Sequence, residues 1–503
     1  MKIVVFLIWS VILSPLNIFC QQITYADYER EDSKDINFEV IGKMHGNFLV
    51  YKNIRWKHNI TVYDNDMRIK EKINLDFIPD KTFNIDFLAY PDFFYMVYQY
   101  QKRNILHCVA QKMNADGKRL GNSQELDTTQ IGILADNKIY STNHSEDKQK
   151  IIIYKIQKKN ERLNLTTLLF DNQLSLIRKS REEMNYEDRR DVLGELLVDN
   201  QGTIIFTRGM KAGNRDYIND LSLVIKEPLK DSLQYYPIHL DKFYVDDVEL
   251  KIDNLNGHYL LNSFFYKQRR GNIDGLFTYV WNKATADKIF SAMIEFNDSL
   301  RIEAKKDGQY RYAFNDFFIR QVIVKKDGSY LLTAEDYSLQ SRGNTNGWNR
   351  YDYLYSPYFS QYDNYLNSSP YNWYRPYNTY NNVSTRYYYD NIMILSIDKN
   401  STLQWSSIIH KNQFDDDNDN YLSFGIMNSG GEIHFLFNTD VNKNQLLADH
   451  SFTSEGNITR NPPLKSQDKG YKFMPRFAKQ VGARQVILPC NYRGYIVFAK
   501  IDF

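Results

Sequence analysis

The sequence predicts an all-β fold: a β-propeller of about eight blades, each of four antiparallel strands, with seven blades as the alternative. Three observations lead to this prediction. A short apolar strand recurs along the chain, each copy follows a polar turn with Gly or Asp, and the copies are spaced like propeller blades. Of the 503 residues, 43% are apolar, which is enough to fill the core of a large ring.

The recurrent strand is rich in Phe, Tyr, Ile, Leu and Val. Its copies begin at Asn47, Phe94, Ile139, Ile204, Tyr259, Tyr330, Ile433 and Val486. The intervals are about 46, 45, 65, 55, 71, 103 and 53 residues, whereas a blade needs roughly 40–50 residues plus loop insertions. The longest interval contains a tyrosine-rich stretch, and without residues 351–389 it falls to about 64 residues.

Further strands surround each recurrent strand. The first copy is followed by NITVYDN and RIKEKINLD, and the second by ILHCVAQKMN and the tail after Asp116-Gly117. The sixth is followed by NIMILSIDKN and LQWSSIIHK, which lie beyond the tyrosine-rich stretch. Asp-Gly and Asp-Asn turns accept the positive φ of tight hairpins. Segments such as VLGELLVDNQG, FIRQVIVKKDG and FGIMNSGG precede the recurrent strand and complete four strands per unit.

The last unit, residues 473–503, has room for only three strands. Because an open ring exposes strand edges, we expect residues 23–28 to supply the missing strand. The third unit is irregular, and residues 179–190 (KSREEMNYEDRR) are predicted to be a solvated loop between blades, with a helical turn as the alternative. Residues 283–297 are expected to contain a short helix. The structural alternative is two β domains divided near residue 200.

The first 20 residues have the features of a signal peptide: Lys2, a short apolar run over residues 3–13, and Pro15. Phe19 precedes Cys20 where a lipobox needs a small residue, so soluble export is favoured over a lipid anchor. The mature chain, residues 21–503, is then expected to be one propeller domain in the periplasm, at the outer-membrane surface or outside the cell. No second apolar stretch reaches the ~20 residues of a membrane-spanning helix.

The balance of charge and the sparse cysteines exclude several classes of function. With 63 basic and 61 acidic residues, the chain lacks the basic excess of a nucleic-acid-binding protein. Cys108 and Cys490 lie in apolar runs and are expected to be buried free thiols rather than a disulfide framework. The histidines show no zinc-ligand spacing.

Catalytic motifs are absent from the sequence. Neither G-x-S-x-G nor G-x-x-x-x-G-K-[ST] occurs. The acidic pairs Glu335-Asp336 and Asp246-Asp247 place neighbours on opposite faces of a strand, so each pair offers at most one inward carboxylate. Carboxylates from different blades can still converge on a central channel, as a glycosidase would require.

One acidic run resembles the start of a calcium loop. Asp415, Asp417 and Asp419 alternate as in such a loop, but Asn420 stands in place of the turn glycine and no Glu follows at the twelfth position. A solvated connection between blades is the alternative. No other cofactor is expected.

The tyrosine-rich stretch is the candidate binding surface. Residues 351–389 contain 13 of the 39 tyrosines, interleaved with Asn, Ser and Pro and without a strand or helix period. Tyr, Trp and Arg dominate binding hot spots. The candidate contacts are Trp348, Tyr371, Trp373, Tyr374 and Arg375. A low-complexity tract without a fixed structure is the alternative.

Polar residues on both sides of this stretch can flank such a surface. They are Thr333, Glu335, Asp336, Tyr337, Ser341, Arg342, His410 and Lys411. Local hydrogen bonding within hairpins is the alternative role for each of them.

The chain resembles exported, largely uncharacterised β-propeller-like proteins of Gram-negative bacteria. The resemblance rests on the leader ending in QQ, the Lys-, Asn- and Tyr-rich strands, and turns such as VKKDGSYLLTAE and MNSGGEIHFLF. It is a likeness of fold and implies no catalytic residues. The predicted function is non-enzymatic binding or scaffolding by a monomer that engages a protein or glycan of the cell envelope. The alternative is a glycan-directed enzyme with carboxylates at the channel.

Overall fold

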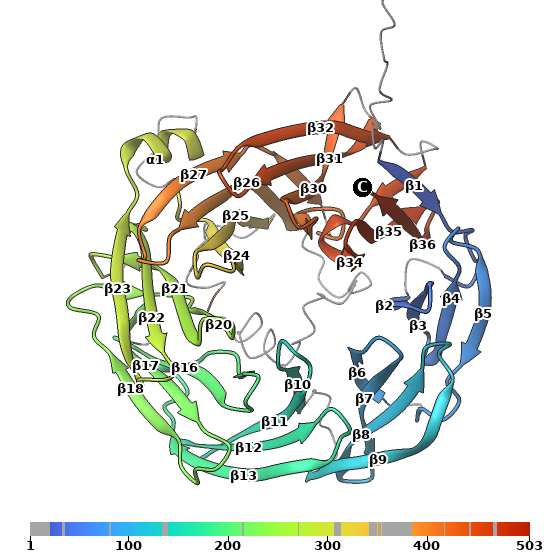
Figure 1. Cartoon of the computed structure of the whole chain (residues 1–503), viewed down its shortest axis with the longest axis horizontal. Coiled ribbons are helices and arrows are strands. Elements are labelled where there is room, and N and C mark those ends of the chain that lie inside the picture. Colours follow the sequence, from blue (N-terminus) through green and yellow to red (C-terminus); the bar gives the residue numbers. More distant parts are fainter. Residues whose placement is uncertain are drawn as a thin grey trace, which may run out of the picture.

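The computed structural model describes residues 21–32, 36–79, 82–132, 139–213, 216–269, 271–305, 313–341, 350, 354, 385–416, 418–441, 444–465 and 470–503. These residues form antiparallel sheets arranged around a ring, with the first strand of each sheet toward the middle and the last at the rim (Figure 1). The chain is therefore an all-β propeller, and the predicted fold class is confirmed.

Blades 1 to 4 follow one another along the chain. Blade 1 contains β2 (Asn37–Met44), β3 (Asn47–Ile54), β4 (Lys57–Tyr63) and β5 (Ile69–Asn74). Blade 2 contains β6 (Thr82–Ala89), β7 (Phe93–Lys102), β8 (Ile105–Asn114) and β9 (Arg119–Gln130). Blade 3 contains β10 (Tyr140–His144), β11 (Lys150–Lys159), β12 (Arg162–Asp171) and β13 (Leu176–Asn185). Blade 4 contains β14 (Asp191–Leu193), β15 (Leu197–Val198), β16 (Ile204–Lys211), β17 (Ile218–Lys226) and β18 (Gln234–Ile238).

Blades 5 to 8 complete the ring. Blade 5 contains β19 (Tyr244–Val245), β20 (Glu249–Asp253), β21 (His258–Tyr266), β22 (Gly275–Asn282) and β23 (Asp287–Glu295), and helix α1 (Asp298–Ala304) follows it. Blade 6 contains β24 (Phe317–Val324), β25 (Tyr330–Ser341), β26 (Thr385–Ile397), β27 (Leu403–Ile409) and β28 (Gln413–Asp416). Blade 7 contains β29 (Phe424–Asn428), β30 (Glu432–Val441), β31 (Asn444–Thr453) and β32 (Ile458–Lys465). Blade 8 contains β33 (Tyr471–Phe473), the short 3-10 helix η2 (Pro475–Phe477), β34 (Lys479–Gly482), β35 (Gln485–Tyr492) and β36 (Tyr495–Asp502).

The N-terminal strand β1 (Gln22–Tyr25) closes the ring. It pairs antiparallel with β36, from Gln22 opposite Asp502 to Tyr25 opposite Ala499. It becomes the outermost strand of blade 8, as the predicted closure by residues 23–28 requires.

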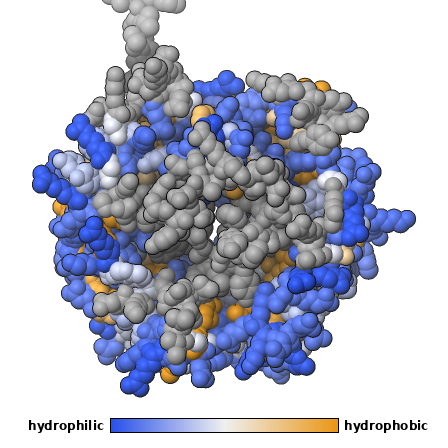
Figure 2. Space-filling model, turned by 180° about the vertical axis from the view of Figure 1, so that it is seen from behind, coloured by the Kyte–Doolittle hydropathy of each residue, from blue (hydrophilic) through white to orange (hydrophobic). Residues whose placement is uncertain are grey.

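The core is divided among the junctions between blades. Eight clusters of buried apolar side chains lie one at each junction, including the junction of blade 8 with blade 1. In β3, Phe48 and Val50 pack toward blade 8, whereas Leu49 and Tyr51 pack toward blade 2. Middle strands bury both faces, so their sequences are continuously apolar rather than alternating. The surface that faces away from the view of Figure 1 is mostly hydrophilic where residues are described, with scattered apolar patches (Figure 2).

One side-chain-capped turn recurs around the ring. The Oδ1 atom of Asp64 accepts hydrogen bonds from the backbone N–H groups of Asp66 and Arg68, both at 2.9 Å. The fourth residue of the turn, Met67, has a φ of 61°. The same arrangement recurs with Asn114, Asp171, Asp199 and Asp398 as the accepting residue. These side chains fix the hairpins that the Asp/Asn-rich turns predicted.

Three local predictions are wrong. Residues 179–185 are not a loop, because they belong to β13 and pair with β12. Residues 287–295 are not helical, because β23 pairs with β22 along its length. The helix begins after Asn297, whose Oδ1 accepts a hydrogen bond from the Leu300 N–H at 2.9 Å. In blade 3, the segment at Ile139 leads into the innermost strand β10, and the strand equivalent to the other copies is β11.

Other sequence-based predictions have the following outcomes. Cys108 and Cys490 are buried and are not joined in a disulfide, as expected. Residue 200, the boundary in the two-domain alternative, lies in the turn between β15 and β16 of blade 4. Residues 1–20, the predicted signal peptide, lie outside the described residues. Among the helices in the described part of the chain, none is both long and apolar enough to cross a membrane.

Candidate functional site

The tyrosine-rich stretch departs from the sheet of blade 6 between β25 and β26. These strands pair up to Ser341 opposite Thr385. Trp348, Tyr371, Trp373, Tyr374 and Arg375 all lie outside the described residues.

The predicted bounds of this insertion, residues 351–389, need correction at both ends. Residues 385–389 form the start of β26, and Tyr389 is buried against Tyr337 with ring centroids 4.8 Å apart. Leu354 is also buried, in a cluster with Phe318, Tyr337 and Leu422. The sequence shows no alternation of apolar and polar residues at the start of β26, because consecutive tyrosines occupy both faces of the strand there. Residues 355–384 can therefore be removed without deleting any described residue.

A buried ionic network lies in blade 6 beside the Leu354 cluster, farther along β25 than the point at which the stretch leaves the sheet. The Lys411 ammonium lies 2.8 Å from Oε1 of Glu335, and the Arg320 Nε lies 3.2 Å from Oε2. The Ser423 hydroxyl donates a hydrogen bond to Oε2 at 2.7 Å. The Glu335 side chain has no exposed surface and that of Lys411 has 2%. Glu335 of β25 is thus held by Arg320 of β24, by Lys411 between β27 and β28, and by Ser423 in the connection to blade 7, and it is not poised as a free base.

The network continues from blade 6 into blades 7 and 8. Lys411 Nζ donates to the Tyr389 carbonyl at 2.7 Å and to Gln413 Oε1 at 2.9 Å. Gln413 Nε2 donates to the Asn438 carbonyl of β30 at 2.8 Å. The Tyr389 hydroxyl donates to Asp419 at 2.8 Å, and Asp419 forms an ion pair with Arg476 of η2. These contacts hold the edge of the insertion rigidly against three blades.

Two carboxyl groups beside this network hold protons unusually tightly. Burial raises the pKa of Asp336 to about 8, and repulsion from Asp316 and Asp390 adds to this effect. Burial likewise raises the pKa of Asp390, although Lys411 opposes the rise. Asp336 is therefore largely protonated at neutral pH. Neighbours on one strand have different roles here, as the alternation of strand faces predicts.

The other acidic pair also divides into two environments. Asp246 is buried and accepts hydrogen bonds from the Tyr266 hydroxyl at 2.5 Å and Arg350 Nε at 2.6 Å. The Arg350 guanidinium lies 4.1 Å from the centroid of the Phe318 ring. The Asp247 carboxylate instead repels the negative charge of Glu249 and helps to raise the pKa of Glu249. Arg350 therefore joins the start of the tyrosine-rich stretch to blade 5.

Two further acidic side chains lie on the inner side of blades 4 and 5: Glu195, between β14 and β15, and Glu249, on β20. Burial raises the pKa of Glu249 to about 8, and repulsion from Asp247 and Glu195 contributes. Burial raises the pKa of Glu195 to about 7. Glu249 lies on β20, which faces the middle of the ring (Figure 1). The Asn143 side chain of blade 3 donates to Glu195 at 3.1 Å.

The residues of the possible calcium loop fall only partly within the described part of the chain. Asp415 lies in β28 opposite Tyr387, and Asp417 lies outside the described residues. Burial by itself would raise the pKa of Asp419. The charge of Arg476 and the hydrogen bond from Tyr389 have the larger combined effect, so the pKa lies below its ordinary value. Among described residues, no three His, Cys, Asp or Glu side chains gather as a metal site.

The sequence indicated some of these residues and missed others. Glu335 and Lys411 were identified as polar residues flanking the tyrosine-rich stretch, and the structure brings them together. Arg320, Ser423 and Arg476 were missed because each comes from a different element and no local spacing connects them. The only available signal is an isolated charge or hydroxyl near the end of an apolar strand.

Comparisons with known proteins support no assignment beyond the fold. No protein-family model matches the chain, and no curated protein matches it. Among solved structures, prolyl oligopeptidase B from Galerina marginata has 7% identity and a TM-score of 0.41, covering 92% of this chain and 56% of that one. The Synechocystis apocarotenoid oxygenase has 9% identity and a TM-score of 0.35, covering 96% and 93%. The chain thus spans little more than half the length of the prolyl oligopeptidases that it matches.

Proposed function

We propose that this protein is an exported, non-enzymatic binding propeller that engages a protein or glycan of the cell envelope through the tyrosine-rich stretch of blade 6. The observation that carries the proposal is the buried ionic network of blade 6, beside the Leu354 cluster. Glu335, Lys411, Arg320 and Ser423 are engaged with one another. Such a network is suited to holding a loop in place and offers no activated nucleophile.

The composition of the stretch supports a role in contact. Tyrosine presents a large amphipathic surface at a low cost in side-chain entropy, and Ser and Asn add adaptable hydrogen bonds. The anchors at its two ends, Arg350 with Asp246 and Tyr389 with Asp419, reduce the ordering cost of binding.

The test removes residues 355–384 and replaces them with a short Gly-Ser linker. We expect the variant to unfold within a few °C of the parent, because the buried residues Arg350, Leu354 and Tyr389 remain, and to lose the partner captured by the intact protein from its cell envelope. A matched variant keeps the full length of the stretch and replaces its tyrosines by serine. If both variants retain the partner, the stretch is not the binding surface.

A second candidate function is a glycan-directed enzyme with its acids at the channel. The raised pKa values of Glu249 and Glu195, about 8 and about 7, favour it because a general acid must hold its proton near neutral pH. For this function, Glu249→Gln would lower the release of reducing ends from a susceptible polysaccharide by about 100-fold or more, with an unchanged unfolding temperature. Hydrolysis at the parental rate in Glu249→Gln would eliminate this role for Glu249.

A further inference from the structure

Blades 4 and 5 are joined in a way that departs from the repeat. Strand β18 ends at Ile238, opposite Leu221, although its neighbour β17 continues to Ile218. The chain turns inward after Ile238, and β19 pairs with both β17 and β21. Blades 4 and 5 consequently form one continuous sheet. The outer strand of blade 4 therefore stops before the end of β23 in blade 5, and part of the face of blade 5 is left uncovered.

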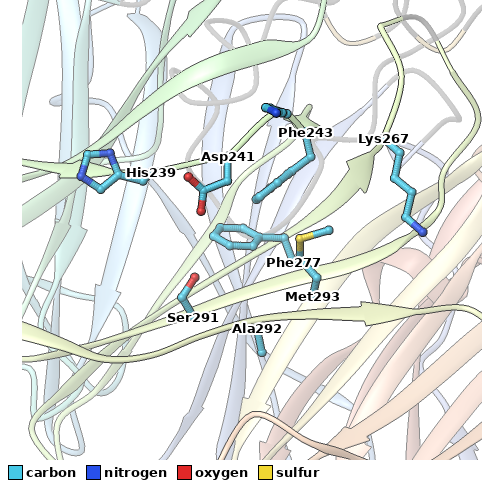
Figure 3. Close-up of a pocket in the computed structure, with 9 residues that line it drawn as sticks. His239, Asp241, Phe243, Lys267, Phe277, Ser291, Ala292 and Met293 are labelled. Carbon is cyan, nitrogen blue, oxygen red and sulfur yellow. The ribbon is translucent and has the colours of Figure 1, made fainter.

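A pocket of about 340 Å³ occupies this gap (Figure 3). Phe243, Phe277 and Met293 form its apolar part, with Phe277 directly opposite Met293 in the sheet. Farther along the same face, Tyr236 of β18 covers Trp281, with ring centroids 4.4 Å apart. The pocket is thus the segment of the face that β18 does not reach. Its volume lies in the range of small-molecule sites, roughly 300–1,000 Å³.

The turn that opens the pocket has an unusual backbone. Asp241 and Lys242 have φ values of 29° and 77°, and the Phe243 N–H donates to the Leu240 carbonyl at 2.8 Å. Left-handed conformations are unfavourable for residues other than Gly, and less so for Asn and Asp. Backbone held in such conformations is concentrated at ligand sites and switches.

The polar groups of the rim are available to a ligand. The side chains of His239, Asp241 and Lys242 are exposed and form no hydrogen bond or ion pair with any described residue. In Figure 3 the Asp241 carboxylate lies between His239 and the two phenylalanine rings. The Lys267 ammonium is already 2.8 Å from Glu295. The remaining carboxylate and ammonium balance each other, which favours a ligand without net charge.

We propose that this pocket binds a neutral hexose unit of a glycan. A hexose offers hydroxyl groups that both donate and accept, matching Asp241, Lys242, His239 and Ser291. It also offers an apolar face of C–H groups for Met293, which is 42% exposed above the largely buried rings of Phe243 and Phe277. The inference goes beyond the proposed function by assigning a second binding site, with one ligand class, to the ring. The site uses blades 4 and 5 and no residue of the tyrosine-rich stretch.

The test measures saturation-transfer NMR from the full-length mature protein to lactose, maltotriose and mannotriose. We expect transfer to ring C–H protons of at least one sugar. Ser291→Trp places a large side chain in the pocket from an exposed strand position and should abolish the transfer. Asp241→Asn retains a residue tolerated at positive φ and should weaken binding about tenfold through loss of the carboxylate. Lys288→Trp, an exposed position on the same strand outside the pocket lining, is the matched control and should behave as the parent.

The two proposals fail separately. The pocket assignment is overturned if no sugar receives saturation, if Ser291→Trp binds like the parent while folding normally, or if only apolar probes such as phenylalanine amide bind. The last result would indicate a protein side chain as the occupant. Removal of residues 355–384 should leave the sugar signal intact. Loss of the captured partner in that variant concerns the tyrosine-rich stretch alone.

Discussion

Buried charges at the junctions between blades follow a common pattern at the residue scale. The fully buried Lys52 ammonium contacts Asp32 and lies 2.8 Å from Glu29, both of the N-terminal segment. Lys155 lies 2.6 Å from Asp127 of the preceding blade. Glu335 and Lys411 form a buried pair within blade 6, and Ser423 links this pair to the connection with blade 7. Removing one partner of such a pair leaves a buried charge uncompensated, so these pairs constrain how neighbouring blades align.

Asp336 is expected to make stability depend on pH. Its folded-state pKa of about 8 lies above that of an unfolded Asp, about 3.9. The unfolded chain therefore releases this proton first, and Asp336 destabilises the fold progressively as pH rises from about 4 to about 8. Asp336→Asn keeps the neutral form. We expect it to match the parent near pH 4 and to exceed its free energy of unfolding at pH 8 by a few kcal/mol, measured by denaturant titration.

Asp327, in the turn between β24 and β25 of the same blade, provides a control with the opposite sign. Hydrogen bonds from the Ser329 hydroxyl and backbone lower the pKa of Asp327, so Asp327→Asn should lose stability above the ordinary Asp pKa rather than gain it. A difference between Asp336→Asn and the parent that stays constant from pH 5 to pH 8 would refute the raised pKa.

At the scale of elements, the sequence predicted inner and middle strands better than outer ones. Middle strands such as β3 and β35 bury both faces, and their apolar runs identify them directly. The outer strand β13 is largely solvated, and its charged sequence LIRKSREEMN resembles a loop. The outer strand β23 contains helix-favouring Lys, Ala and Met, but its hydrogen bonds to β22 override that preference. Solvated outer strands lack the apolar signal on which strand prediction depends.

The candidate site was predictable only in part for a related reason. Glu335 and Lys411 stand near the ends of recognisable strands and beside an evident insertion. Their connection to Arg320, Ser423 and Arg476 is created by the closure of the ring. The pocket on blade 5 depends on where β18 stops and on two residues with positive φ. Neither feature leaves a motif in the sequence.

For the whole molecule, hydrogen bonds between the first hairpin turns of successive blades supplement the apolar junctions. The Asp147 N–H donates to Asn200 at 3.2 Å, and the Asn200 N–H donates to Asn254 at 3.1 Å. Comparable contacts join blades 1 and 2, 2 and 3, 5 and 6, 7 and 8, and 8 and 1. Because every blade packs against its two neighbours, the weakest junction between blades limits the stability of the ring.

Strand β1, near the N-terminus, closes the ring by pairing with β36 near the C-terminus, so its loss should weaken the whole ring. A chain that starts at Ala26 lacks Gln22–Tyr25 and exposes the edge of β36. We expect a loss of about 1–3 kcal/mol, since several ladder hydrogen bonds and the packing of Ile23 and Tyr25 disappear, together with concentration-dependent association through the free edge. A peptide of residues 21–28 should restore the unfolding temperature by adding a strand in trans. An unfolding temperature equal to that of the parent, with no response to the peptide, would show that the ring is closed by side-chain packing alone.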